Sequence, residues 1–407
     1  MRVVGLAVLC LTGGWPGRLS GQQDTVRLTL DVVLTRVRGE HPLARAGGAS
    51  IAAAKARAVD LTRYPNPSFE VERTTFSAAD NVALMQPIRW PWEGSALRDL
   101  GRADVAAVEA EARGELGGVL LAAAQSFAEG LRDAGAVTLA VEAESLASRA
   151  LAHTVAGRRL GQVGDLSVLQ AQVGLDAARR ARVAAQGERD AASASLAVLL
   201  GYDPGTLLAY DGELATTAPL AAPESAQARA AAAADPEAAR LAAAAERGSQ
   251  LARLAHARQW PQLELGPAAS LEGPAVVGLN LRLTLPLWNW QGAAIQAGQA
   301  EREAALARLE GRGRAVAAQV LDATAVLSRA ERELVVLRGG ELTRAAQAES
   351  LAAQALEQGG PYLPTWLAAR AAYLDARRAE LDLEWAAAQA RLQLRYLAGG
   401  LSPEAEQ

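Results

Sequence analysis

The side chains that most often carry out chemistry are few in this sequence and far apart. Histidine occurs three times, at His41, His153 and His256, and no two of them have the four-residue spacing of helical zinc sites. The only cysteine, Cys10, stands in an apolar run near the start of the chain. We therefore predict no metal site and no cofactor.

No group of residues predicts a catalytic centre either. Gly311-Arg312-Gly313 lacks the Lys-Ser/Thr pair that follows the glycines of a phosphate-binding loop. No serine, histidine and acid stand in an order that indicates a catalytic triad. Glu70, Glu72 and Glu264 alternate with apolar residues along predicted strands, and polar side chains that face water need no catalytic role. We therefore expect no enzyme activity.

The glutamates belong to segments in which polar and apolar residues alternate. The clearest runs from Leu279 to Leu287, with leucine at every odd position and Asn280, Arg282 and Thr284 between. Successive side chains of a strand point to opposite faces, so this segment has one apolar and one polar face. In a soluble sheet the leucines would cover a core. In a membrane barrel they would face lipid while the polar residues line a wet lumen.

Tryptophans at the end of this strand favour the membrane. Trp288 and Trp290 follow the last leucine, and Trp90 and Trp92 follow a second alternating run from Val82 to Ile88. Indole rings settle at the boundary between membrane and water. The predicted strands therefore resemble those of a barrel more than those of a soluble sheet.

The composition predicts that helices surround these strands. The chain has 407 residues, of which 50% are apolar but only 4% aromatic, and alanine and leucine are the commonest apolar residues. Such a composition is typical of long, closely packed helices. The net charge is −4 and no basic block occurs. Nucleic acid is therefore excluded as the expected partner.

The start of the chain reads as a secretory signal peptide over residues 1–21. Met1-Arg2 is followed by a short apolar run and then by glycine and proline. A lipid anchor at Cys10 is the alternative, but Leu9 before it is not a small residue. No other stretch approaches the roughly 18 apolar residues of a spanning helix, so a mature chain that enters a membrane must do so with strands.

The rest of the chain is an internal duplication. Residues match across the two halves roughly 200 positions apart: Asp235-Pro236 with His41-Pro42, Pro286 with Pro87, Gly359 with Gly161, and Gly399 with Gly201. Each unit reads helix, strand, strand, long helix, tight turn, helix. We predict a first repeat over 22–201, with strands at about 65–92 and a helical hairpin at about 95–200. A connector (202–234), a second repeat (235–400, strands about 261–290, hairpin about 292–398) and a tail (401–407) follow.

The long helix of the second repeat carries a coiled-coil pattern. Its small and apolar residues step by three and four without a miss: Leu306, Leu309, Gly313, Val316, Val320, Ala323, Leu327, Ala330, Leu334 and Leu337. An ordinary globular helix would show a wider apolar stripe. Gly130 and Gly135 interrupt the first long helix, where we expect some flexibility.

The chain resembles the TolC-like outer-membrane efflux family in its signal peptide, its duplicated units and two sequence segments. The segments are Arg159-Leu160-Gly161 through Leu169-Gln170-Ala171-Gln172, and Leu285-Pro286-Leu287 with Gly292. Trp90-Pro91 and Trp288-Asn289 are similar to the heavy-metal cation efflux branch. The resemblance implies a mainly α fold with a small β part. Its coiled-coil helices would form a periplasmic tunnel, and four strands from each chain would enter a trimeric twelve-stranded outer-membrane β-barrel.

This topology assigns places to the strand residues. Residues near 73–81 and 267–275 would face the exterior, and the strand ends would carry a periplasmic aromatic belt made of Tyr64, Trp90, Trp92, Trp260, Trp288 and Trp290. The lipid-facing strand would present Leu279, Leu281, Leu283 and Leu285. The lumen would be lined by Glu70, Glu72, Asn280, Arg282 and Thr284.

The resemblance also implies that the tips of the two helical hairpins dock a periplasmic adaptor protein. The tip residues are Leu160, Gly161, Gln162, Val163, Leu166, Gly359, Tyr362 and Leu363, with Trp366 nearby. Family members commonly carry aspartates just beyond the second tip, whereas this chain has Thr365 and Ala368 there. Asp165 and Glu357 lie close enough in sequence to replace them.

These observations lead to two hypotheses. The first is a passive exit duct from periplasm to exterior, in the cell outer membrane and extending into the periplasm. It would serve a tripartite efflux or type I secretion system as a homotrimer, with an adaptor and an inner-membrane pump on other chains. The second is a soluble periplasmic coiled-coil adaptor or scaffold, because adaptors also have long helical hairpins. Metal ions, drugs and secreted proteins remain open as cargo.

Overall fold

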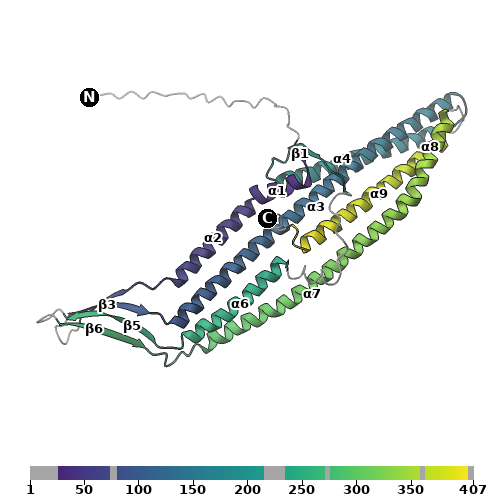
Figure 1. Cartoon of the computed structure of the whole chain (residues 1–407). Helices are drawn as coiled ribbons and strands as arrows, with labels where there is room; N and C mark the ends of the chain where they lie inside the picture. Colours follow the sequence, from purple (N-terminus) through teal and green to yellow (C-terminus); the bar gives the residue numbers. More distant parts are fainter. Residues whose placement is uncertain (1–25, 74–79, 215–233, 271–275, 358–362, 402–407) are drawn as a thin grey trace, which may run out of the picture.

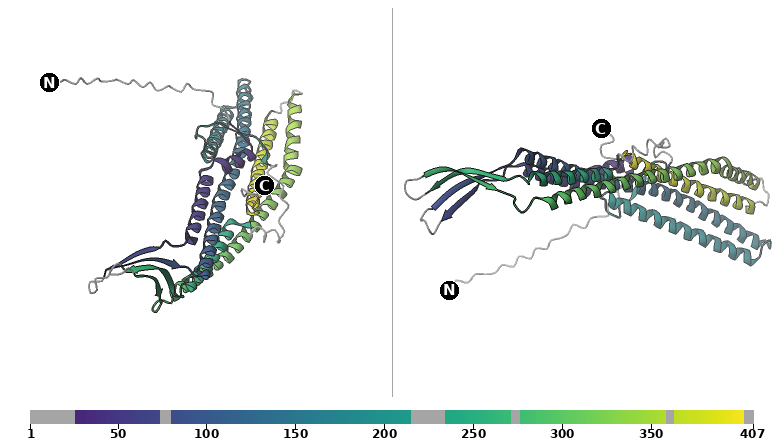
Figure 2. Two further views of the ribbon diagram at one scale, coloured as in Figure 1. Left: turned by 60° about the vertical axis from the view of Figure 1, so that its left-hand side comes forward. Right: turned by 90° about the horizontal axis from the view of Figure 1, so that it is seen from below.

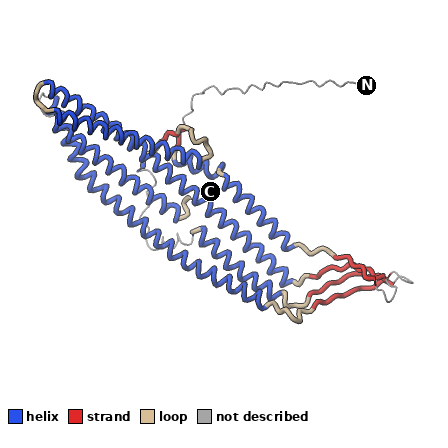
Figure 3. Tube along the Cα trace, turned by 180° about the vertical axis from the view of Figure 1, so that it is seen from behind, coloured by secondary structure: helices blue, strands red, loops and turns tan. Residues whose placement is uncertain are grey.

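Long helices and a four-stranded sheet form an elongated molecule, with this sheet at one end (Figures 1 and 3). The computed structural model describes residues 26–73, 80–214, 234–270, 276–357 and 363–401. The predicted signal peptide, residues 1–21, lies outside these residues. None of the described helices is both long enough and apolar enough to cross a membrane.

The first half of the chain follows the predicted order of elements. Its bounds are α1 Leu30–Glu40, α2 Pro42–Thr62, β2 Ser68–Arg73, β3 Asp80–Ile88, α3 Pro91–Arg159 and α4 Asp165–Leu199. At 69 residues, α3 is about 100 Å long at ~1.5 Å per residue. It runs from the sheet to the far tip of the molecule (Figure 1).

The second half repeats this order. Its bounds are α6 Pro236–Ala257, β5 Gln262–Ser270, β6 Val276–Thr284, α7 Gly292–Val336, the π-helical segment η2 Leu337–Leu342, α8 Thr343–Glu357 and α9 Leu363–Leu397. The predicted class, mainly α with a small β part and a duplicated unit, is confirmed. The π-helical segment was not predicted; it contains Gly339 and Gly340, for which no periodic pattern gives a signal.

Neighbouring helices form one curved layer. Near the strands the order across the layer is α2, α3, α6, α7, and toward the other end α4 and α9 lie beside α3 and α8. Figure 2 shows the α3/α4 and α8/α9 hairpins separating toward their tips. The helix order beside the sheet is the same as the strand order within it, β2, β3, β5, β6.

A small parallel pair of strands at the middle of the molecule was missed by the sequence reading. β1 (Val26–Leu28) pairs with β4 (Leu208–Tyr210), which lies in the segment predicted as a connector. Each strand has three residues, too few for an alternating pattern to be recognised. The largest buried cluster surrounds this pair, and we call it the waist: Leu28, Val33, Leu34, Leu120, Phe127, Leu196, Leu392 and Leu401 are its main side chains. Leu401, predicted as the start of a free tail, is completely buried there.

The two glycines of α3 at which we expected flexibility are sites of close packing. A Cβ atom at Gly130 would lie 2.2 Å from the ring of Tyr210, and one at Gly135 would lie 3.0 Å from Leu381. Tyr210 also contacts Phe127 with ring centroids 5.8 Å apart. These glycines allow other elements to pack directly on the backbone of α3, which sequence periodicity cannot indicate.

The predicted seam of α7 is buried only in part. From Val316 to Leu337 the predicted positions are buried, mostly against α9. Nearer the strands, Leu306 is exposed and the buried residues are instead Ile295, Gly298 and Ala305. The reason is that α7 packs on α6 in this half and on α9 in the other, so its buried stripe moves around the helix.

We predict a large stability difference between two Gly→Ala variants of α7. At Gly298 a Cβ would lie 2.7 Å from the backbone nitrogen of Ala252 and 2.9 Å from the carbonyl oxygen of Gly248, whereas at Gly311 it would meet nothing within 4 Å. Gly298→Ala should therefore cost about 1–3 kcal/mol by forcing the helices apart. Gly311→Ala should gain up to about 1 kcal/mol from helix propensity. Thermal unfolding of both variants measures this; equal melting temperatures would contradict the close approach of α6 and α7.

Candidate functional site

The four long strands form one antiparallel sheet in the order β2, β3, β5, β6. Its register includes the pairs Ser68↔Met85 in the first hairpin and Gln262↔Thr284 in the second. β3 and β5 join the two hairpins and thereby the two repeats. In the described part of the chain, β2 and β6 are each paired along one side only. Both outer edges of the sheet are open.

One face of the sheet is apolar and exposed. Its side chains include Phe69, Val71, Leu84, Ile88, Val277, Leu279, Leu281 and Leu283, which are 37–74% exposed. Such a continuous apolar surface on a monomer marks a contact with lipid or with another protein. Leu285, predicted on the same strand, is also exposed but lies just beyond the end of β6 at Thr284. The predicted alternating run extends to Leu287, so the strand ends three residues earlier than we expected.

The opposite face is polar and concave. Arg282 on β6 pairs with Glu264 on the neighbouring strand at 3.1 Å and with Glu70 on β2. β2 and β6 are the two outer strands, roughly 14 Å apart in a flat sheet at ~4.8 Å per strand. The Glu70–Arg282 pair therefore requires the sheet to curl around its polar face. Met85, which lies on this face, is completely buried.

The remaining residues predicted for the lumen share this face. Glu72, Asn280 and Thr284 alternate with apolar residues in the same register as Glu70 and Arg282. Glu72 is exposed, and the structure records no hydrogen bond or ion pair for it among the described residues. The structure thus brings the predicted polar residues together on one concave surface.

Aromatic residues lie at the junctions between sheet and helices. The rings of Trp90 and Trp92 stack with centroids 5.0 Å apart, and Trp260 lies 5.4 Å from Trp92. The indole nitrogen of Trp90 donates a 2.8 Å hydrogen bond to the carbonyl oxygen of Pro261. Trp90 lies between the end of β3 and the start of α3, Trp92 lies in the first turn of α3, and Trp260 lies between α6 and β5. These contacts connect the first repeat to the second.

The other three predicted belt residues are more isolated. Tyr64 lies 6.0 Å from the guanidinium group of Arg89, and Trp290 accepts a hydrogen bond from the side chain of Gln259 through its carbonyl oxygen. Trp288 is 94% exposed, the most exposed of the large hydrophobic residues. Five of the six aromatic residues lie within the short connections between strands and helices, and Trp92 is the second residue of α3.

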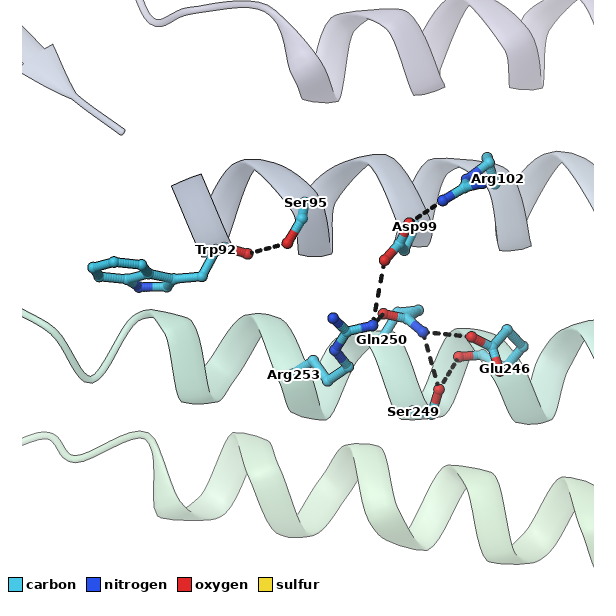
Figure 4. Close-up of polar contacts among 8 residues, drawn as sticks. All are labelled: Trp92, Ser95, Asp99, Arg102, Glu246, Ser249, Gln250 and Arg253. Atoms are coloured by element: carbon cyan, nitrogen blue, oxygen red, sulfur yellow. Dashed lines mark hydrogen bonds and ion pairs between the residues drawn. The ribbon is translucent and has the colours of Figure 1, made fainter. Parts of the chain in front are cut away.

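Ion pairs continue the junction between repeats from the sheet into the helices. Acids of α3 face arginines of α6: Glu93–Arg258 at 3.4 Å, Asp99–Arg253 at 3.3 Å and Asp104–Arg247 at 2.7 Å. Figure 4 shows Asp99 between Arg253 of α6 and Arg102 of its own helix. Each pair is partly exposed and contributes below about 1 kcal/mol. Successive pairs are five or six residues apart on each helix, as expected for one antiparallel register of α3 and α6.

At the far end, α3 turns into α4 through the first predicted tip. Gly161 has φ +72°, a left-handed conformation that favours glycine, and Gln162 N donates to the carbonyl oxygen of Gly157 at 2.9 Å. Leu160 and Leu166 are 73% and 68% exposed. Val163 is less exposed and would lie 3.5 Å from a Cβ at Gly157. The tip therefore presents two uncovered leucines on a rigid turn.

The backbone arrangement matches several solved channels. No protein-family model matches the sequence, and neither does any curated protein. Among solved structures, the outer-membrane channel OprN aligns with TM-score 0.77 and 16% identity over 91% of this chain and 90% of that one. The outer membrane protein VceC from Vibrio cholerae gives 0.72 and 16% over 91% and 96%. The MtrE outer membrane channel from Neisseria gonorrhoeae gives 0.69 and 18% over 93% and 91%.

This chain has the TolC-like outer-membrane channel fold. The resemblance predicted from the sequence is confirmed at the level of fold. CusC, for which folding and transmembrane channel formation have been described, aligns with a similar TM-score of 0.75. Because these scores differ little, the assignment to a heavy-metal branch stays a prediction.

In this TolC-like fold the second tip lies mostly outside the described residues. Gly359 and Tyr362 fall there, and Leu363 begins α9 without a described side chain. Trp366, which we expected to offer an apolar contact, is 9% exposed and lies 5.7 Å from the guanidinium group of Arg149. It packs between the two hairpins instead. Asp165, suggested as a replacement for a pore aspartate, pairs with Arg158.

Ion pairs between helices of this chain were not predicted from the sequence. Arg338 in η2 pairs with Glu380 at 2.7 Å and with Glu384, both on α9. Burial raises the pKa of the Glu384 carboxyl. At the waist, burial likewise raises the pKa of Asp133, which pairs with Arg132 at 3.2 Å. Within the described ranges, no three His, Cys, Asp or Glu residues are placed to hold a metal ion.

Proposed function

We propose that this chain is the outer-membrane channel of a tripartite efflux or type I secretion system. One observation carries the proposal: an exposed apolar face and a concave polar face belong to the same open-edged sheet, at the end of a long helical layer. A barrel wall in a bilayer needs both faces. In water alone, the apolar face would cost about 25 cal/mol for each exposed Å².

The open edges require further copies of the chain. An unpaired strand edge in lipid leaves backbone groups without partners, at a cost of several kcal/mol each. Four strands are too few to close a barrel, since the smallest membrane barrels have about eight. We propose a homotrimer in which each chain gives four strands to a twelve-stranded wall. The helices would then surround a continuous duct that extends into the periplasm.

The duct would be passive. No catalytic, cofactor or metal residue is proposed, so the energy for transport would come from an inner-membrane pump coupled through a periplasmic adaptor. The hairpin tips, with Leu160 and Leu166 exposed, would be the adaptor-docking end. The concave face would select solutes only by charge and width.

A soluble periplasmic adaptor or scaffold is the second candidate, because the hairpins alone would suit either role. It is disfavoured by the exposed leucines of β6, which a soluble protein would cover. Cell fractionation and planar-bilayer recording discriminate the two. The channel is expected in the outer-membrane fraction, and the purified protein is expected to conduct ions. Recovery of the mature protein in the soluble periplasm without detergent would contradict the proposal.

We predict that Leu160→Asp abolishes export while the trimer stays intact. Leu160 is 73% exposed and lies at the turn, so its loss should not disturb the packing of α3. A charge there would disrupt an apolar docking contact. Drug or metal tolerance of cells measures export, and native gel electrophoresis measures the trimer. Normal export in a trimeric variant would show that this tip is not the docking surface.

A further inference from the structure

The open edges of this chain extend beyond the sheet. α2, which precedes β2, has one buried residue among its 21, Ala54. On the other side, α7 follows β6 and buries only Ile295, Gly298 and Ala305 before Val316. Each side of the molecule therefore offers a strand and a helix that are covered on one flank only. The two sides are different surfaces, so copies would associate head to tail and close into a ring.

The duplication indicates how such a contact is made. Within the chain, β3 is the second strand of the first repeat and pairs with β5, the first strand of the second repeat. β6 is the second strand of the second repeat, and β2 is the first strand of the first. If two copies make the same kind of contact as β3 and β5 make within the chain, β6 of one copy pairs with β2 of the next.

The paired residues inside the chain also predict the register of that contact. The hairpin pairs Ser68↔Met85 and Gln262↔Thr284 are equivalent, so Ser68 corresponds to Gln262 and Met85 to Thr284. The prolines agree, because Pro87 and Pro286 each lie two residues further on. The internal pair Gln86↔Leu265 then corresponds to Leu285 opposite Val71 of the next copy. On the polar face, Thr284 is opposite Glu72.

Charge supports this placement. In this register, Arg282 is diagonal to Glu72 of the next copy, a distance that long side chains bridge. A slip of one residue would instead move Glu72 to the face opposite Arg282 and abolish the contact. In the single chain Arg282 reaches Glu70 across the whole sheet, whereas Glu72 is exposed without a partner among the described residues. In the ring, β2 of the next copy is one strand spacing away.

We propose that Arg282 of one copy pairs with Glu72 of the next across the joint between subunits, and that the pair excludes a slip by one residue. The inference rests on the proposed function, because it names the partner of the same sheet. The pair matters because a slip by one residue would turn every leucine of β6 toward the lumen. In the correct register, the apolar stripe of Leu283 and Leu285 continues into Phe69 and Val71.

Disulfide cross-linking tests the register. In full-length chains carrying Cys10→Ser, the pair Glu72→Cys with Thr284→Cys should give covalent dimers and trimers on non-reducing gels after mild oxidation. The matched control, Val71→Cys with Thr284→Cys, places the thiols on opposite faces and should remain monomeric on the gel. Glu70→Cys with Arg282→Cys is a second control: in the proposed register position 70 lies opposite 286, four residues from 282, so this pair should also remain monomeric.

Substitution of Glu72 tests the ion pair. The side chain of Glu72 is exposed and has no hydrogen bond or ion pair among the described residues, so a charge-dependent effect of Glu72→Lys on trimer stability points to a second copy. We expect Glu72→Lys to lower the trimer melting temperature by several degrees more than Glu72→Gln, and Arg282→Gln to remove most of that difference. Equal melting temperatures for the two Glu72 variants would overturn the ion pair.

The outcomes separate this inference from the proposed function. A conducting trimer in which the Glu72/Thr284 cysteine pair gives no cross-linked species would overturn the inference and leave the channel standing. A soluble monomer would overturn both. Cross-linking of Glu70→Cys with Arg282→Cys between chains, in place of Glu72 with Thr284, would overturn the register.

Discussion

Leu281→Arg is expected to prevent assembly of the channel, whereas Asn280→Arg is expected to assemble. The two residues are adjacent at the middle of β6 and therefore lie at the same depth, but they point to opposite faces of the sheet. Leu281 is 62% exposed on the apolar face. An arginine facing lipid near the bilayer midplane costs about 2–4 kcal/mol, and each trimer would carry three of them.

The measurement is the fraction of folded trimer in the outer membrane, determined by heat-modifiable migration on gels. An arginine at position 280 would enter the polar concave face, where water and Glu264 are close by. Leu283→Asp should likewise impair assembly and Thr284→Asp should assemble. The difference should be smaller, because acidic residues facing lipid cost less than basic ones. If the arginine variants assemble equally, the leucine face of β6 does not meet lipid.

A second large effect is expected at Asp235, which begins α6. Its carboxylate is 3% exposed, accepts a hydrogen bond from Ala238 N at 2.9 Å and pairs with Arg312 of α7 through two contacts of 2.8 Å. Removing one partner of a buried ion pair leaves the other uncompensated. Because Arg312 keeps some contact with water, we expect Asp235→Ala to cost about 2–3 kcal/mol.

The duplication supplies a matched control for this prediction. His41 occupies the equivalent position before Pro42, and its ring nitrogen accepts a hydrogen bond from Leu43 N at 3.2 Å in an exposed site. His41→Ala should therefore cost only about 0.5 kcal/mol. Asp235→Asn separates the two roles at Asp235, since an asparagine keeps the cap and loses the charge. Unfolding by heat, followed by circular dichroism, measures all three variants; equal losses for His41→Ala and Asp235→Ala would exclude a special role for Arg312.

The two predictions differ in how much of their basis can be recognised in the sequence alone. The alternation of leucine and polar residues around Leu281 is visible in a single line of sequence, because a strand has a period of two residues. The pairing of Asp235 with Arg312, which are 77 residues apart, leaves no local pattern. Sequence reading recognised Asp235-Pro236 only as a helix start that matches His41-Pro42.

The same distinction explains why the packing at the glycines and at part of the seam was not predicted. Gly130 reads as a weak point in a helix until Tyr210 is found packed against it. Leu306 continues a perfect heptad pattern, yet it is exposed because α7 changes its partner from α6 to α9. In both places, the decisive contact comes from a segment whose position no periodicity describes.

The sequence by itself determined the duplicated units, the two faces of the strands, the turn at Gly161 and the lack of a recognisable catalytic motif. These properties are local, since they follow from periods of two and about 3.6 residues and from glycine and proline at chain reversals. Only the tertiary structure decided that the waist forms around β1 and β4, that Trp90 and Trp92 start a helix, and that Arg282 reaches Glu70. Those contacts join residues far apart in the chain, and their energies depend on how the helices and strands pack.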